Sequence, residues 1–141
     1  MAILDEVRSK VLACLGGEGT AAAIERVSVG IFFTGVKLTT GTGGLCFTPV
    51  KDMPEAVCCP SSAGRIRDPR KIRGMRAEEV LGDLDSVEPL RRAIAVAVMN
   101  ALSAACWERG FQGDYEIRCR TDAQDLIPLA GDAEVTVIGA L

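Results

Sequence analysis

The chain contains no histidine, and this absence removes the commonest general base near neutral pH and the commonest metal ligand in proteins. Ser-His-Asp and Cys-His catalytic arrangements are therefore excluded from this sequence. Aromatic residues make up only 4% of the chain, so a ligand cage built from several aromatic rings is not expected. Catalysis would need a carboxylate, a lysine or a cysteine with a perturbed pKa, or a group supplied by another domain.

The sequence also lacks an export signal and an apolar run long enough to span a membrane. Asp5 and Glu6 stand where a secretory signal would have a basic segment. The longest stretch without a charge covers residues 93–107, whereas a membrane-spanning helix needs about 20 predominantly apolar residues. We therefore expect a cytoplasmic protein without membrane contact. In that compartment its six cysteines are expected to be thiols: Cys14, Cys46, Cys58, Cys59, Cys106 and Cys119.

What the chain does have is enough apolar sequence for one domain. It has 141 residues, of which 48% are apolar, and a domain of this length buries roughly two-thirds of its unfolded surface. The net charge of −3 is too small to indicate a nucleic-acid partner. Residues 65–76 nevertheless carry six basic side chains against one acid. They could bind a phosphate or carboxylate, or they could form a solvated loop that pairs with the acidic remainder.

The first half of the chain predicts a helix followed by strands. Apolar residues recur at helical spacing over 3–15, and Gly16 and Gly17 then end the predicted helix. Residues 24–33 alternate between apolar and polar and predict a strand, with Thr34-Gly35 as a tight turn or bulge. Two further strand segments separated by the glycines of residues 41–44 complete an antiparallel meander of about three strands. The predicted fold class is α+β.

The second half predicts a long connection and then a central helix. Residues 50–76 show no sustained period, and a short helix over 76–81 follows them. The helix from about residue 87 to 108 is apolar on nearly every side, which predicts protein contacts around most of it. Asn100 is the polar exception on this helix. It is expected to tie the helix to a strand or loop backbone, and a ligand contact is the alternative.

Three segments together resemble a known family. These are residues 29–38 (VGIFFTGVKL), residues 43–49 (GGLCFTP) and residues 91–102 (RRAIAVAVMNAL). In this order they resemble the enolase N-terminal-like domain of the family described as "putative heavy-metal chelation". The resemblance covers roughly residues 1–130.

The resemblance implies a domain organisation and a place for a ligand. Residues 1–130 would form the enolase N-terminal-like domain, and residues 131–141 resemble the first strand of a missing Rossmann-like domain. Members of this kind are expected to bind a ligand in the cleft between the two domains. The end of the first strand lies near that cleft, which makes Thr34, Gly35 and Lys37 candidate ligand-binding residues.

The loop around Cys58 is the best chemical candidate in the sequence. Two adjacent thiols, Cys58 and Cys59, could hold a soft heavy-metal ion with a third ligand from elsewhere. Ser61, Ser62 and Arg65 follow in the same loop and could bind a ligand. Neither a CxxC pair nor a histidine is present to complete a tetrahedral site, so packing or turn roles are the alternative.

Three functional hypotheses follow. The first is a binding and capping domain that forms one wall of a small-molecule or metal-chelate site, completed by a Rossmann-like partner domain or another subunit. The second is a structural domain that oligomerises through its terminal strand. The third is a small enzyme that uses a carboxylate, Lys or Cys. Because no reactive arrangement is evident, the sequence favours binding over catalysis by this chain alone.

Overall fold

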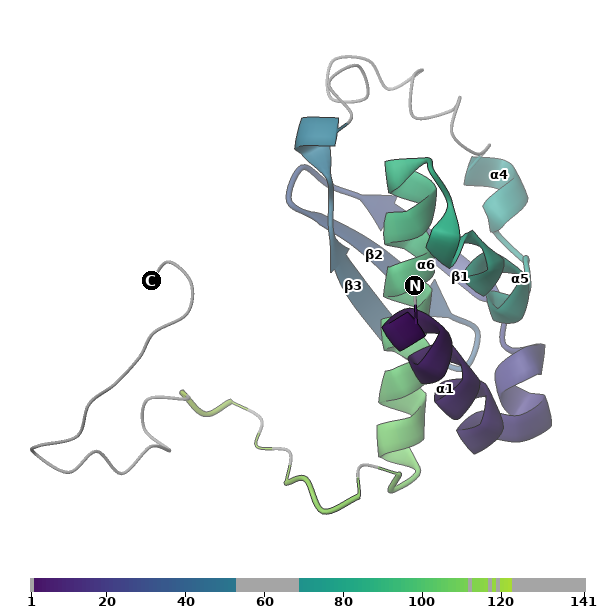
Figure 1. Cartoon of the computed structure of the whole chain (residues 1–141), viewed down its shortest axis with the longest axis vertical. Coiled ribbons are helices and arrows are strands. Elements are labelled where there is room, and N and C mark those ends of the chain that lie inside the picture. Colours follow the sequence, from purple (N-terminus) through teal and green to yellow (C-terminus); the bar gives the residue numbers. More distant parts are fainter. Residues whose placement is uncertain (1, 53–68, 112, 117, 119, 123–141) are drawn as a thin grey trace, which may run out of the picture.

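The fold is an α+β arrangement in which a three-stranded antiparallel sheet packs against helices (Figure 1). The computed structural model describes residues 2–52, 69–111, 113–116, 118 and 120–122. Its strands follow the chain in the order β1-β2-β3. They are β1 (Ile24–Val29), β2 (Phe33–Leu38) and β3 (Gly43–Phe47). The predicted fold class and the predicted meander are therefore confirmed.

The helical elements flank the sheet in chain order. They are α1 (Ala2–Ala21), the 3-10 turn η1 (Val50–Asp52), α4 (Pro69–Ile72), α5 (Ala77–Leu81), the 3-10 turn η2 (Gly82–Asp85) and α6 (Pro89–Glu108). None of the helices in the described ranges is long and apolar enough to cross a membrane.

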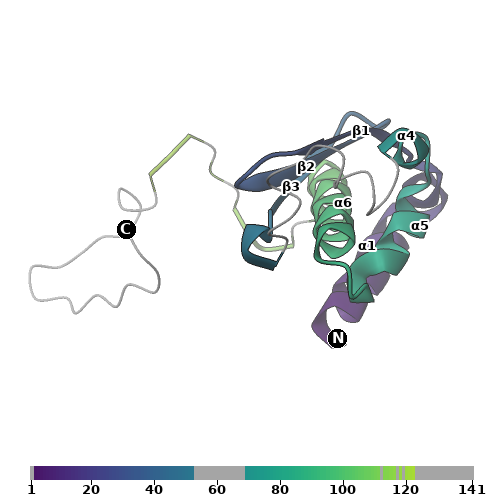
Figure 2. The ribbon, with the colours of Figure 1, turned by 90° about the horizontal axis from the view of Figure 1, so that it is seen from above.

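Figure 2 shows how the sheet and the helices are layered. Helix α6 lies across one face of the sheet and packs against β2 and β3, and α1 and α5 pack against α6. We call the sheet face that contacts α6 the inner face and the opposite face the outer face. Among the described elements, no helix covers the outer face.

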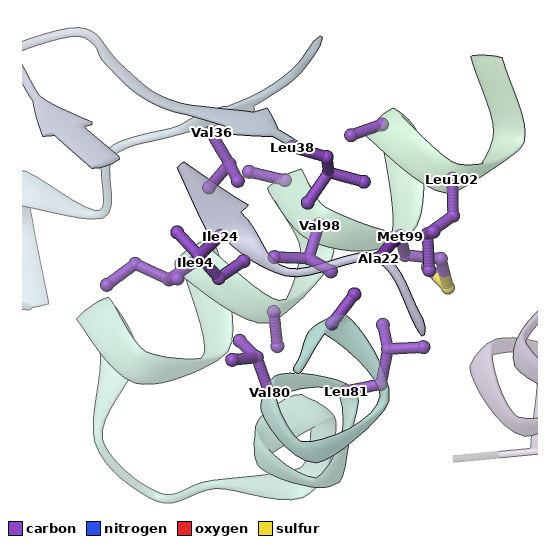
Figure 3. Close-up of a cluster of buried hydrophobic side chains, with 14 of the residues drawn as sticks. Ala22, Ile24, Val36, Leu38, Val80, Leu81, Ile94, Val98, Met99 and Leu102 are labelled. Atoms are coloured by element: carbon purple, nitrogen blue, oxygen red, sulfur yellow. The ribbon is translucent and has the colours of Figure 1, made fainter. Parts of the chain in front are cut away.

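The central helix α6 has the predicted position and the predicted cover on most sides. Pro89 occupies its first turn, where the missing N–H of a proline leaves no hydrogen bond unmade. No side chain caps this helix, and the Ser86 hydroxyl accepts a hydrogen bond from the Glu88 amide just before it. The buried side chains of α6 then join those of the sheet and α5 in one core (Figure 3).

The sheet and α6 approach each other closely at one glycine. A Cβ at Gly44 of β3 would overlap the Ala97 carbonyl oxygen and the Ala101 amide nitrogen of α6. Only a residue without a side chain allows the two backbones to pack at this distance. Gly44 therefore fixes where the helix crosses the sheet.

Helix α1 is interrupted where the sequence predicts its end. Gly16 has φ 56° and ψ −144°, a non-helical conformation, and the chain then resumes helical turns to Ala21. Glycine adopts this positive φ without the steric cost that a Cβ would impose. The predicted stop is thus a kink, and the helix that carries it is longer than predicted.

The strand predicted over residues 24–33 is confirmed as far as Val29, but its extension to residue 33 and the tight turn or bulge at Thr34-Gly35 are wrong. The chain turns at residues 30–32 instead, where the Gly30 amide donates to the Phe33 carbonyl over 2.8 Å. Thr34 and Gly35 lie inside β2, paired with Val29 and Ser28 of β1. Apolar residues continue to alternate with other residues through Ile31, so the pattern typical of a strand shows no break at this turn.

Some predicted features lie outside the described residues. These are the loop residues Cys58, Cys59, Ser61, Ser62 and Arg65 and the terminal strand predicted within residues 131–141.

Candidate functional site

Strand register determines which side chains meet on the outer face. Arg26 of β1 pairs with Lys37 of β2, and Ser28 pairs with Gly35. Because paired residues share a face and alternate residues point to opposite faces, these four positions lie together on the outer face. Their neighbours Val36 and Thr34 point to the inner face and are buried.

An open groove of about 510 Å³ runs over these positions to the edge of β3. Gly35 and Gly43 contribute no side chains, so backbone forms part of its floor. Two of the lining residues are cations and none is an acid. The lining residues are Arg26, Ser28, Gly35, Val36, Lys37, Gly43, Gly44, Leu45 and Asn100.

The two cations of the groove have different surroundings. The Lys37 ammonium pairs with the Glu25 carboxylate, Nζ to Oε1, over 2.9 Å. The hydrogen bond from Lys37 holds the pKa of Glu25 below its ordinary value, and the charges of Lys37, Arg26 and Arg73 add to this effect. Arg26 is exposed on the neighbouring strand. A guanidinium and an ammonium side by side favour a ligand that carries carboxylate or phosphate groups.

Asn100 links α6 to the edge of the sheet, as expected from the sequence. Its Nδ2 donates to the Leu45 carbonyl of β3 over 2.8 Å. The side chain is nevertheless exposed and lines the groove, so its remaining donor and its amide oxygen can face a ligand. Asn100 thus combines the structural role with a position in the groove.

Of the candidate ligand-binding residues in the described part of the chain, Thr34 is the one that does not reach the groove. Its side chain is fully buried on the inner face, and its Oγ1 lies 2.9 Å from Oγ1 of Thr48. This pair satisfies two buried hydroxyl groups inside the fold. Gly35, Lys37 and Asn100, by contrast, all line the groove.

Arg26 and Ser28 also line the groove and are not among the candidate residues that the sequence predicts. The alternation of residues 26–29 already placed both on the polar side of a strand. What the sequence did not supply was the pairing of β1 with β2, which brings Arg26 opposite Lys37. The sequence of each strand therefore indicates which residues share a face, but it does not indicate which residues of two strands pair.

The described cysteines do not form a multidentate metal site. No three side chains of His, Cys, Asp or Glu gather closely enough to hold a metal ion in the described ranges. Cys14, Cys46 and Cys106 are free thiols, as expected for these three. A soft-metal site would instead depend on Cys58 and Cys59, outside those ranges.

Two of the described thiols, Cys46 and Cys106, have a pKa raised by burial. Burial raises the pKa of Cys46, on the inner side of β3. Burial, followed by contact with the Cys14 thiol, raises the pKa of Cys106 to about 12. The Cys106 thiol also lies 3.8 Å from the Val11 carbonyl, where α6 packs against α1. These features suit packing, since a metal ligand or nucleophile needs an accessible thiolate.

Comparison of the sequence with known protein families gives a match that covers the groove. A family model described as "Putative heavy-metal chelation" matches residues 12–103. The chain belongs to this family. No curated protein and no solved structure matches the chain. The segment shared with the heavy-metal chelation family contains every residue that lines the groove.

Proposed function

We propose that this member of the heavy-metal chelation family is a ligand-binding domain whose outer sheet face forms one wall of a site for an anionic small molecule or metal chelate. The observation that supports this is the groove, whose lining contains Arg26 and Lys37 and no acidic side chain. Divalent ions such as Ni²⁺ form complexes with organic chelators that carry carboxylates, and carboxylate groups pair with Arg and Lys.

The proposal gives each polar group of the groove a role. Arg26 offers a planar fork to one carboxylate, and Lys37 offers a second cation once the ligand competes with Glu25. Asn100 and Ser28 donate to or accept from the remaining polar atoms. The groove is open, so a second wall comes from a further domain or subunit, for which the resemblance suggests a Rossmann-like domain.

The groove can be tested with citrate and with the 1:1 complex of citrate and Ni²⁺ as probes. We expect amide chemical-shift changes along β1, β2 and β3, and at least tenfold weaker binding for Arg26→Ala and Lys37→Ala in calorimetric titrations. Arg92→Ala is the matched control, because this exposed arginine lies on α6 and does not line the groove. Equal weakening by all three variants, or shifts confined to other elements, would contradict the proposal.

The vicinal thiols form a separate arm of the proposal. If Cys58 and Cys59 hold a soft metal ion, the Cys58→Ser/Cys59→Ser variant loses the metal that the anaerobic protein retains in native mass spectrometry. Cys46→Ser is the control, because Cys46 is a free thiol within the sheet. Unchanged metal stoichiometry in the double variant would contradict metal binding by the two thiols. It would not affect the proposal for the groove.

A further inference from the structure

Five large apolar side chains are exposed at one end of the sheet. Phe33 of β2 and Phe47 of β3 are paired on the outer face, and their rings meet edge to face with centroids 6.4 Å apart. Leu45 lies on the same face, and the turn between β1 and β2 adds Ile31 and Phe32. Each of the five is between 58% and 67% exposed. We call these five residues the apolar end.

The size of the apolar end distinguishes it from scattered surface residues. Large apolar side chains each have about 150–250 Å² of surface, so five that are more than half exposed present on the order of 600 Å². The largest apolar patch on a typical monomer covers about 300–600 Å² and is often functional. The apolar end is therefore large enough to be an interface.

We propose that the apolar end is covered by a second copy of this chain, with two outer faces stacked about a twofold axis. Two copies would remove on the order of 1,200 Å² of apolar surface from water, which exceeds the roughly 1,000 Å² that a biological interface should bury. A twofold contact also needs only one self-complementary patch. Sheets that stack in this way pack about 10 Å apart through side chains such as Phe33, Leu45 and Phe47.

The charges of the outer face agree with a twofold contact at this end. Arg26 and Lys37 pair with each other at one end of the β1–β2 ladder, and Phe33 pairs with Phe47 at the other end of β2. An axis through the apolar end keeps the two cationic ends apart, so the stacking buries no like charges against each other. The five side chains of the apolar end carry no polar group that would need a partner after burial.

The dimer would also supply the second wall of the proposed site. Leu45 belongs to both the apolar end and the groove, and its Cδ2 atom would lie 3.1 Å from a Cβ at Gly35. A second copy stacked on Leu45 therefore closes the groove from the apolar end. The second copy would then be the subunit that completes the proposed site, and this step rests on the proposed function. The dimer contact itself does not depend on ligand binding.

Sedimentation equilibrium of the full chain over a range of concentrations tests the dimer without any ligand. The expected result is a dimer that dissociates on dilution, with a dissociation constant at least tenfold higher for Phe47→Ser and for Leu45→Ser. Val87→Ser and Trp107→Ser are matched controls, since both residues are exposed apolar positions outside the sheet. These two variants should associate as the parent chain does.

Circular dichroism of each variant establishes that it is folded, and Ile31→Ser, in the turn, replaces any sheet variant that is not. A chain that stays monomeric at every concentration overturns the inference, because its apolar end is then covered from within the chain or by a different partner. A dimer that Phe47→Ser, Leu45→Ser and Ile31→Ser all leave intact also overturns it. The citrate titrations fail or succeed separately, so the two proposals can be distinguished.

Discussion

The inner and outer faces of the sheet are built from alternate residues of the same three strands, yet their side chains differ in kind. On the inner face, Val36 and Leu38 pack against α6 and Gly44 allows the helix backbone to approach. On the outer face, Lys37 is solvated and Leu45 and Phe47 remain exposed although they are apolar. The inner face therefore builds the hydrophobic core of the domain, and the outer face is the one that we propose for binding.

Replacing one leucine on each face should separate these roles most strongly. Leu38 is 0% exposed and Leu45 is 61% exposed. Leu38→Ala should lower the free energy of unfolding by about 2–5 kcal/mol, because it leaves a cavity beneath α6. Leu45→Ala should cost under about 1 kcal/mol in urea unfolding at a dilution where the chain is monomeric. Similar losses for the two variants would show that the outer face is covered within the monomer.

Two adjacent glycines of β3 offer the same comparison in the backbone. Gly44→Ala should lower the free energy of unfolding by about 1–3 kcal/mol or prevent folding, because the new Cβ overlaps the α6 backbone. A Cβ at Gly43 would lie 3.4 Å from the Val36 carbonyl oxygen, which is an ordinary contact. Gly43→Ala should therefore leave the urea midpoint nearly unchanged. If Gly44→Ala were equally harmless, the close crossing of sheet and helix would be incorrect.

The buried threonine pair tests whether Thr34 belongs to the inner face alone. Thr34→Val leaves the Thr48 hydroxyl buried without its partner and should cost about 1–3 kcal/mol in thermal or urea unfolding. Thr34→Val/Thr48→Val removes both hydroxyls and should regain much of that loss. Binding of citrate should be the same in the double variant as in the parent. Weaker citrate binding by the double variant would indicate that Thr34 contributes to the ligand site.

The helices and strands were predictable where their periodic patterns were long. The apolar helix α6 and the meander both appear as expected, and the kink at Gly16 coincides with the predicted helix end. The turn at residues 30–32 was missed because Ile31 continues the strand pattern. The sequence predicts a turn or bulge at Gly35, whereas in β2 this glycine leaves room for the Leu45 side chain.

The candidate site was predictable only in part, because its residues come from different elements. Gly35, Lys37 and Asn100 were named from the sequence and do line one groove. Thr34 alternates with Gly35 along β2, so its side chain points to the inner face. A prediction with the correct start of β2 would have placed it there. Arg26 needed the register of β1 against β2. Long-range pairing of this kind is a property of the fold and is absent from any local pattern.

The smallest expected effect concerns the charges of the outer face. The pKa of Glu25 lies below its ordinary value in the folded chain, chiefly because Lys37 donates a hydrogen bond to it. Lys37→Met should bring the pKa of Glu25 back toward that ordinary value in an NMR titration of its carboxyl carbon, and Arg26→Gln should move it less. An unchanged titration in Lys37→Met would contradict the ion pair.

The sign of the accompanying stability effect follows from the lowered pKa. A carboxylate with a depressed pKa stabilises the folded state above its unfolded pKa, and this contribution is lost as the pH falls through the folded pKa. Because the pair is solvent-exposed, the loss should be barely detectable in unfolding experiments between pH 7 and pH 3. The same removal of Lys37 should weaken citrate binding at least tenfold. A side chain that matters little for folding but strongly for an anion is what the contrast between the two faces predicts.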